Sequence, residues 1–333
     1  MPAPHDVPAD FDHLTPDAVI DHVEDALGVR CANICRPLNS YINRVYDVQQ
    51  ADGTAVIAKF YRPGRWSPEA LQDEHDFLHE LAEAEIPVIA PLPLCGGGTL
   101  RHDGTLHYAL FPKKGGRVLD EPTPEQWVRL GRLLGRVHLV GAGGTPRDRV
   151  VCTPRELSEP QLETILASGH LPAGCADGYE RAARGILERI GPLFADAERI
   201  RIHGDGHGQN VIERPGEGMF LIDFDDMAVG PPVQDLWMFL PGRLQDALPQ
   251  ADALMEGYTT FRPFDPASWR LVEPLRAMRF IHFTAWCARQ AEDRGFARLS
   301  PDFGTPDYWR RETRDLETQR VEIEDALDAP LPF

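Results

Sequence analysis

The pattern of apolar and polar positions changes after residue 112. Up to that point, short alternating segments bounded by turn residues predict strands at residues 45–49, 55–60 and 108–111. Beyond it, apolar residues recur every three or four positions, which predicts helices at residues 125–139, 179–194, 235–240 and 274–289. We therefore predict an α+β protein with a small sheet-rich lobe at residues 1–112 and a larger, mainly helical lobe at residues 113–333.

Two charged residues interrupt apolar patterns in the first of these lobes. Lys59 lies within the strand predicted at residues 55–60, and Glu74 lies in the middle of the apolar stripe of a helix capped by Ser67. Burying a lone ammonium group is costly, so we predict that Lys59 and Glu74 form an ion pair. The alternative is that Lys59 extends to solvent from an edge strand and Glu74 borders the surface.

The glycines at 131 and 135 are four residues apart in the first predicted helix of the second lobe. This spacing places both on one helix face and favours close packing against another helix. We predict a structural role for the neighbouring His138.

A short β-rich insert carries the strongest chemical signal. Its predicted strands are residues 201–203, 211–213 and 219–223, and it contains His203-Gly204-Asp205, then Asn210, then Asp223. Transfer of a phosphoryl group needs an oxygen acceptor to orient the attacking hydroxyl and oxygen ligands to hold Mg²⁺. We predict Asp205 as the catalytic base and Asn210 and Asp223 as the Mg²⁺ ligands. The alternative is that all three are ordinary turn residues.

The segment before Lys59 is polar and has no glycine. Ser40 and Asn43 lie where a kinase has its phosphate-covering loop, so both are candidate ATP contacts, with an ordinary polar turn as the alternative. The chain also has no Gly-x-x-x-x-Gly-Lys-[Ser/Thr] motif, which argues against a P-loop fold.

Composition narrows the range of partners. The formal net charge is −18, from 52 acidic and 34 basic side chains, which disfavours binding to nucleic acid and mildly favours a cationic substrate. No stretch resembles a secretory signal or a membrane span, so we expect a cytoplasmic protein without a membrane partner. The six cysteines lack disulfide or zinc-site spacing and are expected to be reduced thiols.

Together these residues resemble the aminoglycoside phosphotransferase and choline kinase family, relatives of the protein kinases. Further segments that carry the resemblance are residues 38–41, 59–63, 233–238 and 273–279. The resemblance implies a two-lobed, protein-kinase-like fold that binds ATP between its lobes. It implies that Lys59 contacts the phosphates, that Leu110 and Phe111 belong to a hinge that meets adenine, and that Asp235 supports the catalytic loop together with His203.

Several functions remain open at this stage. The resemblance implies a Ser/Thr protein kinase of the bacterial stress response that uses ATP and Mg²⁺, and we expect a monomer. A small-molecule kinase of the aminoglycoside, choline or homoserine type would need the same catalytic residues. A zinc-dependent hydrolase built on His203, Asp205 and His207 is a further alternative. An ATP-binding scaffold without turnover is disfavoured because all three catalytic residues are present.

Overall fold

The computed structural model describes residues 11–293 and 295–331, which form two compact units. The first unit contains the described residues up to Thr123 together with Pro146–Arg149 and His207–Met227, and the second contains the rest. The hairpin of residues 207–227 thus groups with the N-terminal sheet, although the predicted lobes place it in the second. Backbone hydrogen bonds explain this grouping, because Leu221 N–H donates to Pro87 and Leu119 N–H donates to Val211.

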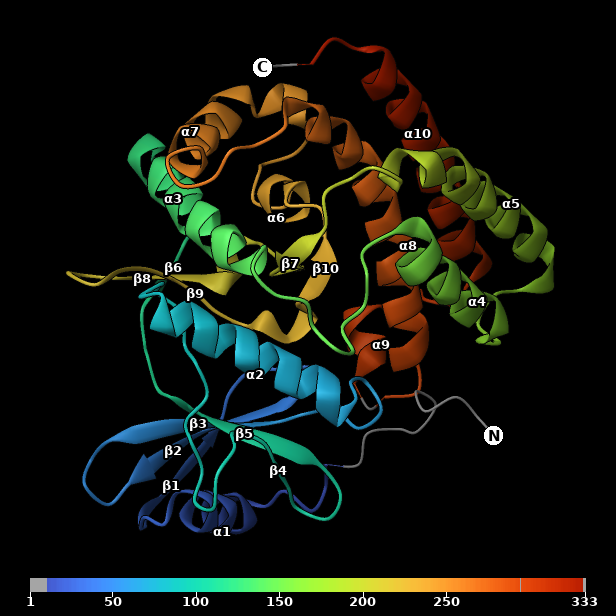
Figure 1. The fold of residues 1–333 in the computed structure, drawn as a ribbon. Coiled ribbons are helices and arrows are strands. Elements are labelled where there is room, and N and C mark those ends of the chain that lie inside the picture. The colour runs from blue at the N-terminus through green and yellow to red at the C-terminus, as the bar shows by residue number, and fades with distance from the viewer. Residues whose placement is uncertain (1–10, 294, 332–333) are drawn as a thin grey trace. The chain divides into compact units, whose positions relative to one another are not determined.

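The first unit is built on a five-stranded antiparallel sheet (Figure 1). Its strand order is β1 (Cys31–Pro37), β2 (Arg44–Gln50), β3 (Ala55–Phe60), β5 (His107–Pro112) and β4 (Arg101–His102). The three strands predicted from the sequence are β2, β3 and β5. The predicted turn between β2 and β3 contains Gly53 at φ 89°, and Asp52 Oδ1 accepts the N–H of Thr54 over 2.9 Å.

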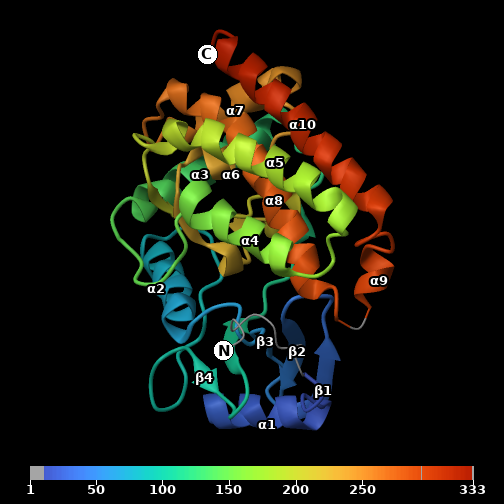
Figure 2. The same cartoon turned by 90° about the vertical axis from the view of Figure 1, so that its right-hand side faces the viewer.

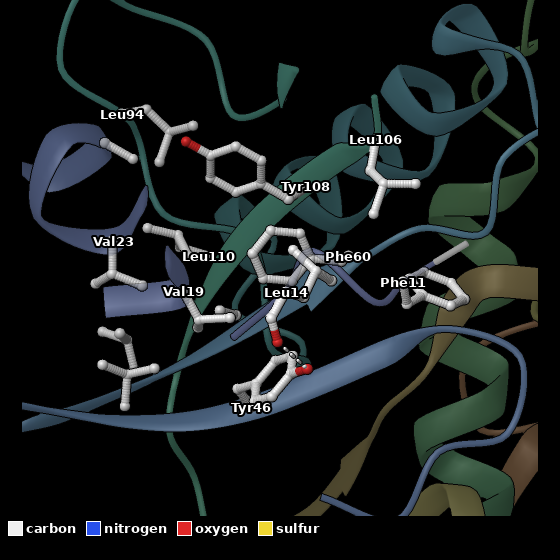
Figure 3. Close-up of a cluster of buried hydrophobic side chains, with 14 residues drawn as sticks. Phe11, Leu14, Val19, Val23, Tyr46, Phe60, Leu94, Leu106, Tyr108 and Leu110 are labelled. Carbon is white, nitrogen blue, oxygen red and sulfur yellow. Dashed lines mark hydrogen bonds between the residues drawn. The ribbon is translucent and has the colours of Figure 1, made fainter. Parts of the chain in front are cut away.

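The two faces of this sheet are covered by different helices (Figure 1). Helix α1 (Pro16–Leu27) packs on the face formed by Ala58, Phe60 and Leu110, and Figure 3 shows the apolar cluster between them. Helix α2 (Pro68–Glu83) covers the opposite face, where Leu71 packs with Tyr61 and Ala109. Since side chains alternate along a strand, Lys59 points to the α2 face.

Helix α2 begins as the sequence predicts. Ser67 caps it by accepting the N–H of Ala70 over 3.0 Å, and Pro68 occupies the first turn. Helix α1 has the same combination of cap and proline, with Thr15 accepting from Ala18. This helix was not predicted.

The β-rich insert is divided between two small sheets. Strands β6 (Arg117–Val118), β8 (Val211–Arg214) and β9 (Gly218–Leu221) form one antiparallel sheet in the first unit. In contrast, β7 (Ile200–Ile202) pairs with β10 (Ala228–Gly230) in the second unit. The sequence grouped β7 with the β8–β9 hairpin, and this grouping is wrong because β7 has a partner further along the chain.

The second unit is mainly helical (Figure 2). Its α-helices are α3 (Pro124–Gly141), α4 (Glu159–Ala167), α5 (Ala173–Ile190), α6 (Val233–Trp237), α7 (Leu248–Tyr258), α8 (Val272–Gln290), α9 (Phe296–Leu299) and α10 (Pro306–Asp328). The four helices predicted in this part correspond to α3, α5, α6 and α8. Helix α10 packs along α5 and α8, and α4 packs against α8. No helix in the described parts of the chain is long and apolar enough to cross a membrane.

Helices α3 and α7 pack through their glycines. A Cβ atom on Gly131 would lie 1.9 Å from the carbonyl oxygen of Leu254, and one on Gly135 would lie 2.7 Å from that of Tyr258. On the facing helix, a Cβ on Gly257 would lie 2.0 Å from the carbonyl oxygen of Val128. The close packing predicted from Gly131 and Gly135 is therefore present.

We predict that Gly131→Ala destabilises the protein by about 1–3 kcal/mol, because the two backbones would have to move apart. The matched control is Gly185→Ala in α5, where an added Cβ would meet no atom within 4 Å. The control should instead stabilise the protein by about 0.5–1 kcal/mol through helix propensity. Urea unfolding of both variants checks this contrast, and similar effects of the two substitutions would contradict it.

Candidate active site

Lys59 and Glu74 are brought together on the α2 face of the sheet. The Nζ atom of Lys59 lies 3.7 Å from Oε1 of Glu74, and both side chains are buried. The position of Glu74 in the middle of the apolar face of α2 puts its carboxylate over β3. The predicted ion pair is therefore present in the structure.

Two further carboxylates reach the same ammonium group from the end of β9. The Nζ atom of Lys59 lies 3.3 Å from Oδ1 of Asp223 and 3.2 Å from Oδ1 of Asp225. Asp223 has a left-handed backbone with φ 61°, and a 3₁₀ turn over Phe224–Asp226 follows it. The two carboxylates differ in accessibility, because the side chain of Asp223 is 56% exposed and that of Asp225 only 5%. Asp223 can meet a ligand, whereas Asp225 is part of the interior.

Two arginines complete this buried charge cluster. Arg65 forms an ion pair with Asp225 and lies 2.6 Å from Asp226. Arg149 donates to Oε2 of Glu74 over 3.1 Å and to the backbone oxygen of Asp225 over 2.7 Å. The sequence predicted no role for either arginine. Both lie in irregular segments, where no periodic pattern marks a residue that points inward.

The ionisation of the cluster follows from these partners. Burial alone would lower the pKa of Lys59, but Asp225, Glu74 and Asp223 together raise this pKa well above its usual value. Burial would raise the pKa of Asp225, yet Arg65, Lys59 and Arg149 hold it far below its usual range. For Glu74, burial is the largest effect and raises its pKa, opposed by Lys59 and Arg149.

Asn43 connects to this cluster through its side-chain amide. Its Nδ2 donates to Oδ2 of Asp225 over 3.3 Å, and its Oδ1 accepts the N–H of Arg62 over 3.1 Å. The side chain is buried, so in this structure Asn43 ties the segment between β1 and β2 to Asp225.

The other predicted ATP contacts lie in the same unit as these charges. Ser40 is half-buried in the irregular segment between β1 and β2. Leu110 is fully buried in the core beneath α1, and its carbonyl oxygen accepts the N–H of Leu92 over 2.7 Å. Phe111 is half-buried and packs against the cluster of Tyr61 and Leu71 on the opposite face.

Asn210 and Asp223 lie together at the open end of the β8–β9 hairpin. The N–H of Ile222 donates to the backbone oxygen of Asn210 over 2.9 Å, which places residues 210 and 223 beside each other. Asn210 Nδ2 lies 3.2 Å from His207 Nε2. A carboxylate and an amide oxygen fit Mg²⁺, which takes few protein ligands and completes its shell with water and phosphate.

In the second unit, a buried carboxylate holds the segment that carries Asp205. Asp235 of α6 accepts the N–H of His203 over 2.7 Å and that of Gly204 over 2.8 Å. Nε2 of His138 lies 2.9 Å from the same carboxylate, and its Nδ1 lies 3.0 Å from the hydroxyl of Tyr258. Burial would raise the pKa of Asp235, but the hydrogen bond from His138 and the other donors lower it. Asp235 thus stays ionised and fixes the backbone on the N-terminal side of Asp205.

The carboxylate of Asp205 is accessible and faces an arginine that the sequence analysis did not identify. Oδ1 of Asp205 lies 3.2 Å from Nη1 of Arg279 on α8, and the side chain of Asp205 is 26% exposed. His203 is buried, and its Nδ1 accepts the N–H of Asp205 over 3.3 Å. The ring of His203 thus bonds to the backbone, and the carboxylate of Asp205 forms an ion pair with Arg279. These contacts give no support to a zinc site built from His203 and Asp205.

Comparison with known proteins assigns the family. Residues 34–272 match the family described as the phosphotransferase enzyme family. The chain belongs to this family. It is 36% identical to stress response kinase A of Salmonella paratyphi A, covering 91% of this chain and 92% of that protein. It is 35% identical to the protein of the same name in Escherichia coli K12, with the same shares covered. The family resemblance predicted from the sequence is confirmed.

Solved structures confirm the kinase-like fold of this phosphotransferase family member. A microcompartment-associated aminopropanol kinase matches with a TM-score of 0.70 and 19% identity, covering 92% of this chain and 98% of that one. Amicoumacin kinase hAmiN matches with a TM-score of 0.69 and 18% identity, covering 95% of each chain. At this level of identity the likeness concerns the fold alone.

We predict that substitutions of the two neighbouring carboxylates on Lys59 change stability to different extents. Asp225→Asn should destabilise the protein by about 3–5 kcal/mol, because it leaves buried Lys59 and Arg65 without their shared charge partner. Asp223→Asn should change stability by less than about 1 kcal/mol, because that carboxylate is half in solvent. Urea unfolding of both variants tests this difference. Equal losses of stability in the two variants would contradict this prediction.

Proposed function

We propose that this phosphotransferase is an ATP- and Mg²⁺-dependent kinase that phosphorylates serine or threonine hydroxyls of a protein. The observation that carries the proposal is the buried Lys59, paired with Glu74 and facing the accessible carboxylate of Asp223. An ammonium group held in this way offers a fixed positive charge to ATP phosphates, and Asp223 offers a metal ligand beside it.

The residues of the first unit would bind and orient the nucleotide. Glu74 holds the ammonium of Lys59 in place, so that little reorganisation is needed when the phosphates bind. Asn210 and Asp223 would hold Mg²⁺, which neutralises charge on the phosphate oxygens when bound. Asp225 anchors Lys59 and Arg65 from the interior and would therefore act by positioning.

Asp205 would act on the acceptor. Its carboxylate accepts a hydrogen bond from the acceptor hydroxyl and takes its proton, as the hydroxyl oxygen bonds to the γ-phosphorus. The bond from that phosphorus to the β,γ-bridging oxygen breaks, and ADP leaves. The hydrogen bonds from the backbone of His203 and Gly204 to Asp235 would keep the carboxylate of Asp205 at a fixed position.

The relatives favour a protein acceptor. The chain is 36% identical over 305 residues to proteins named stress response kinase A and, in Salmonella typhimurium LT2, serine/threonine protein kinase RdoA. The aminopropanol and amicoumacin kinases share its fold at only 18–19% identity. A small-molecule kinase is the second candidate, because other proteins with this fold are named as kinases of aminopropanol and amicoumacin.

We predict that Asp205→Ala lowers phosphotransfer from γ-labelled ATP by about 10²–10⁴-fold, because it removes the general base. ATP affinity should change by less than about threefold, since this carboxylate acts on the acceptor hydroxyl. The assay offers dephosphorylated casein and, separately, aminoglycosides and choline. Asp252→Ala, at an exposed aspartate of α7, is the matched control and should retain full activity.

The acceptor that carries the label decides between the two candidates. Label on serine or threonine that depends on Asp205 supports the protein kinase, and label on a small molecule supports the second candidate. Undiminished transfer by Asp205→Ala would remove Asp205 from its role. No transfer by the unaltered protein to any acceptor would count against the proposed function.

A further inference from the structure

Helix α8 presents one side of its surface beside Asp205. Arg279, whose Nη1 lies 3.2 Å from Oδ1 of Asp205, has a side chain that is 42% exposed. Phe283 and Trp286 follow at four and seven residues, which is the spacing of one helical face. We call these three residues the α8 face. It starts at the proposed catalytic base and continues along the helix away from it.

Arg279 is the arginine of this helix that reaches the base. Arg276, one turn earlier, donates to the carbonyl oxygen of Gly242 over 2.9 Å and lies 4.7 Å from the centre of the Trp237 ring. It also lies 3.2 Å from Glu273. Arg276 is thus engaged in holding α8 to its surroundings, whereas the guanidinium of Arg279 borders both the base and solvent.

The aromatic part of the α8 face is partly exposed. Phe283 is 55% exposed, although large apolar side chains are usually covered. Its ring stacks on that of Trp286 with centroids 5.8 Å apart and planes at 13°. Trp286 in turn contacts Phe296 with centroids 6.4 Å apart. The stacked pair therefore offers an apolar surface on this side of α8.

We propose that the α8 face binds the acceptor polypeptide, with Arg279 pairing with an acidic side chain next to the phosphorylated residue. Phe283 and Trp286 receive an apolar side chain of the same segment. This inference rests on the proposed function, and it adds the sequence preference of the acceptor.

The geometry of α8 sets the number of residues between the acidic and the apolar side chain of the acceptor. At 1.5 Å per residue, Phe283 and Trp286 lie about 6 and 10 Å along the helix from Arg279. An extended peptide advances about 3.3 Å per residue. The apolar side chain therefore falls about two to three residues beyond the acidic one.

Charge supports a polypeptide acceptor over a cationic small molecule. A hydroxyl within hydrogen-bond reach of Asp205 lies about 6 Å from the guanidinium of Arg279. A charge at this distance in a partly solvated site changes binding by roughly tenfold. The net charge of −18 favours cations over the molecule as a whole, but beside the base the guanidinium of Arg279 offsets the carboxylate charge of Asp205.

The test compares kcat/KM for four peptides with a single serine. The residue after the serine is either aspartate or lysine, and the residue three positions beyond that one is either leucine or glutamine. We expect the unaltered protein to prefer aspartate by about tenfold and leucine by about fivefold. Arg279→Glu should reverse the first preference and leave the second, and Phe283→Ser should abolish only the second. Arg314→Glu, at an exposed arginine of α10, is the control for the charge change.

Binding of fluorescent versions of the same peptides is measured by anisotropy in parallel. Thermal unfolding shows that the variants remain folded. A binding preference that follows Arg279 and Phe283, without any phosphate transfer, would support the α8 face and contradict the proposed chemistry. The absence of a preference for aspartate, or an equal effect of Arg279→Glu on all four peptides, would overturn the inference.

Discussion

The ammonium group of Lys59 lies in the interior of the first unit, where a charge without partners would be unstable, and the neighbouring elements are arranged around this constraint. Glu74 comes from α2, and Asp223 and Asp225 come from the end of β9. The same carboxylates then require Arg65 and Arg149, which join two irregular segments to the cluster. One buried charge thus connects strand, helix and hairpin, and the free energy of the cluster depends on all of them being present.

The second unit contains a buried negative charge that is also stabilised by its neighbours. Asp235 is fully buried, and its oxygens accept two backbone N–H groups and a hydrogen bond from His138. His138 reaches Tyr258 on α7, whose close approach to α3 depends on glycine. Helix packing at Gly131 and Gly135 is therefore connected through His138 to the backbone that carries Asp205. This chain of contacts joins the α3–α7 packing to the backbone next to Asp205.

The sequence predicts the parts of this arrangement that depend on local pattern. Lys59 and Glu74 could be paired because each interrupts an apolar stripe, and α2 could be placed from Ser67 and Pro68. Asp225 and Asp226 are adjacent carboxylates with similar surroundings in the sequence, and only the fold buries the first. The pairing of β7 with β10 was missed because it joins segments more than twenty residues apart. Helix α1 was missed although Val19, Val23 and Ala26 follow helical spacing. Helix α10 was also missed, because it has few apolar positions among its charges.

The alternation of side chains along β3 has a consequence for the variation this protein can tolerate. Ala58 and Phe60 face the core under α1, and Lys59 between them faces α2. Inserting or deleting one residue between Gly53 and Lys59 would turn the ammonium group into the apolar core and Phe60 towards the carboxylates. Substitutions in this strand change one contact at a time, whereas a change in its length exchanges both faces at once. Insertions and deletions should therefore be far rarer in this strand, among related proteins, than replacements of its apolar residues.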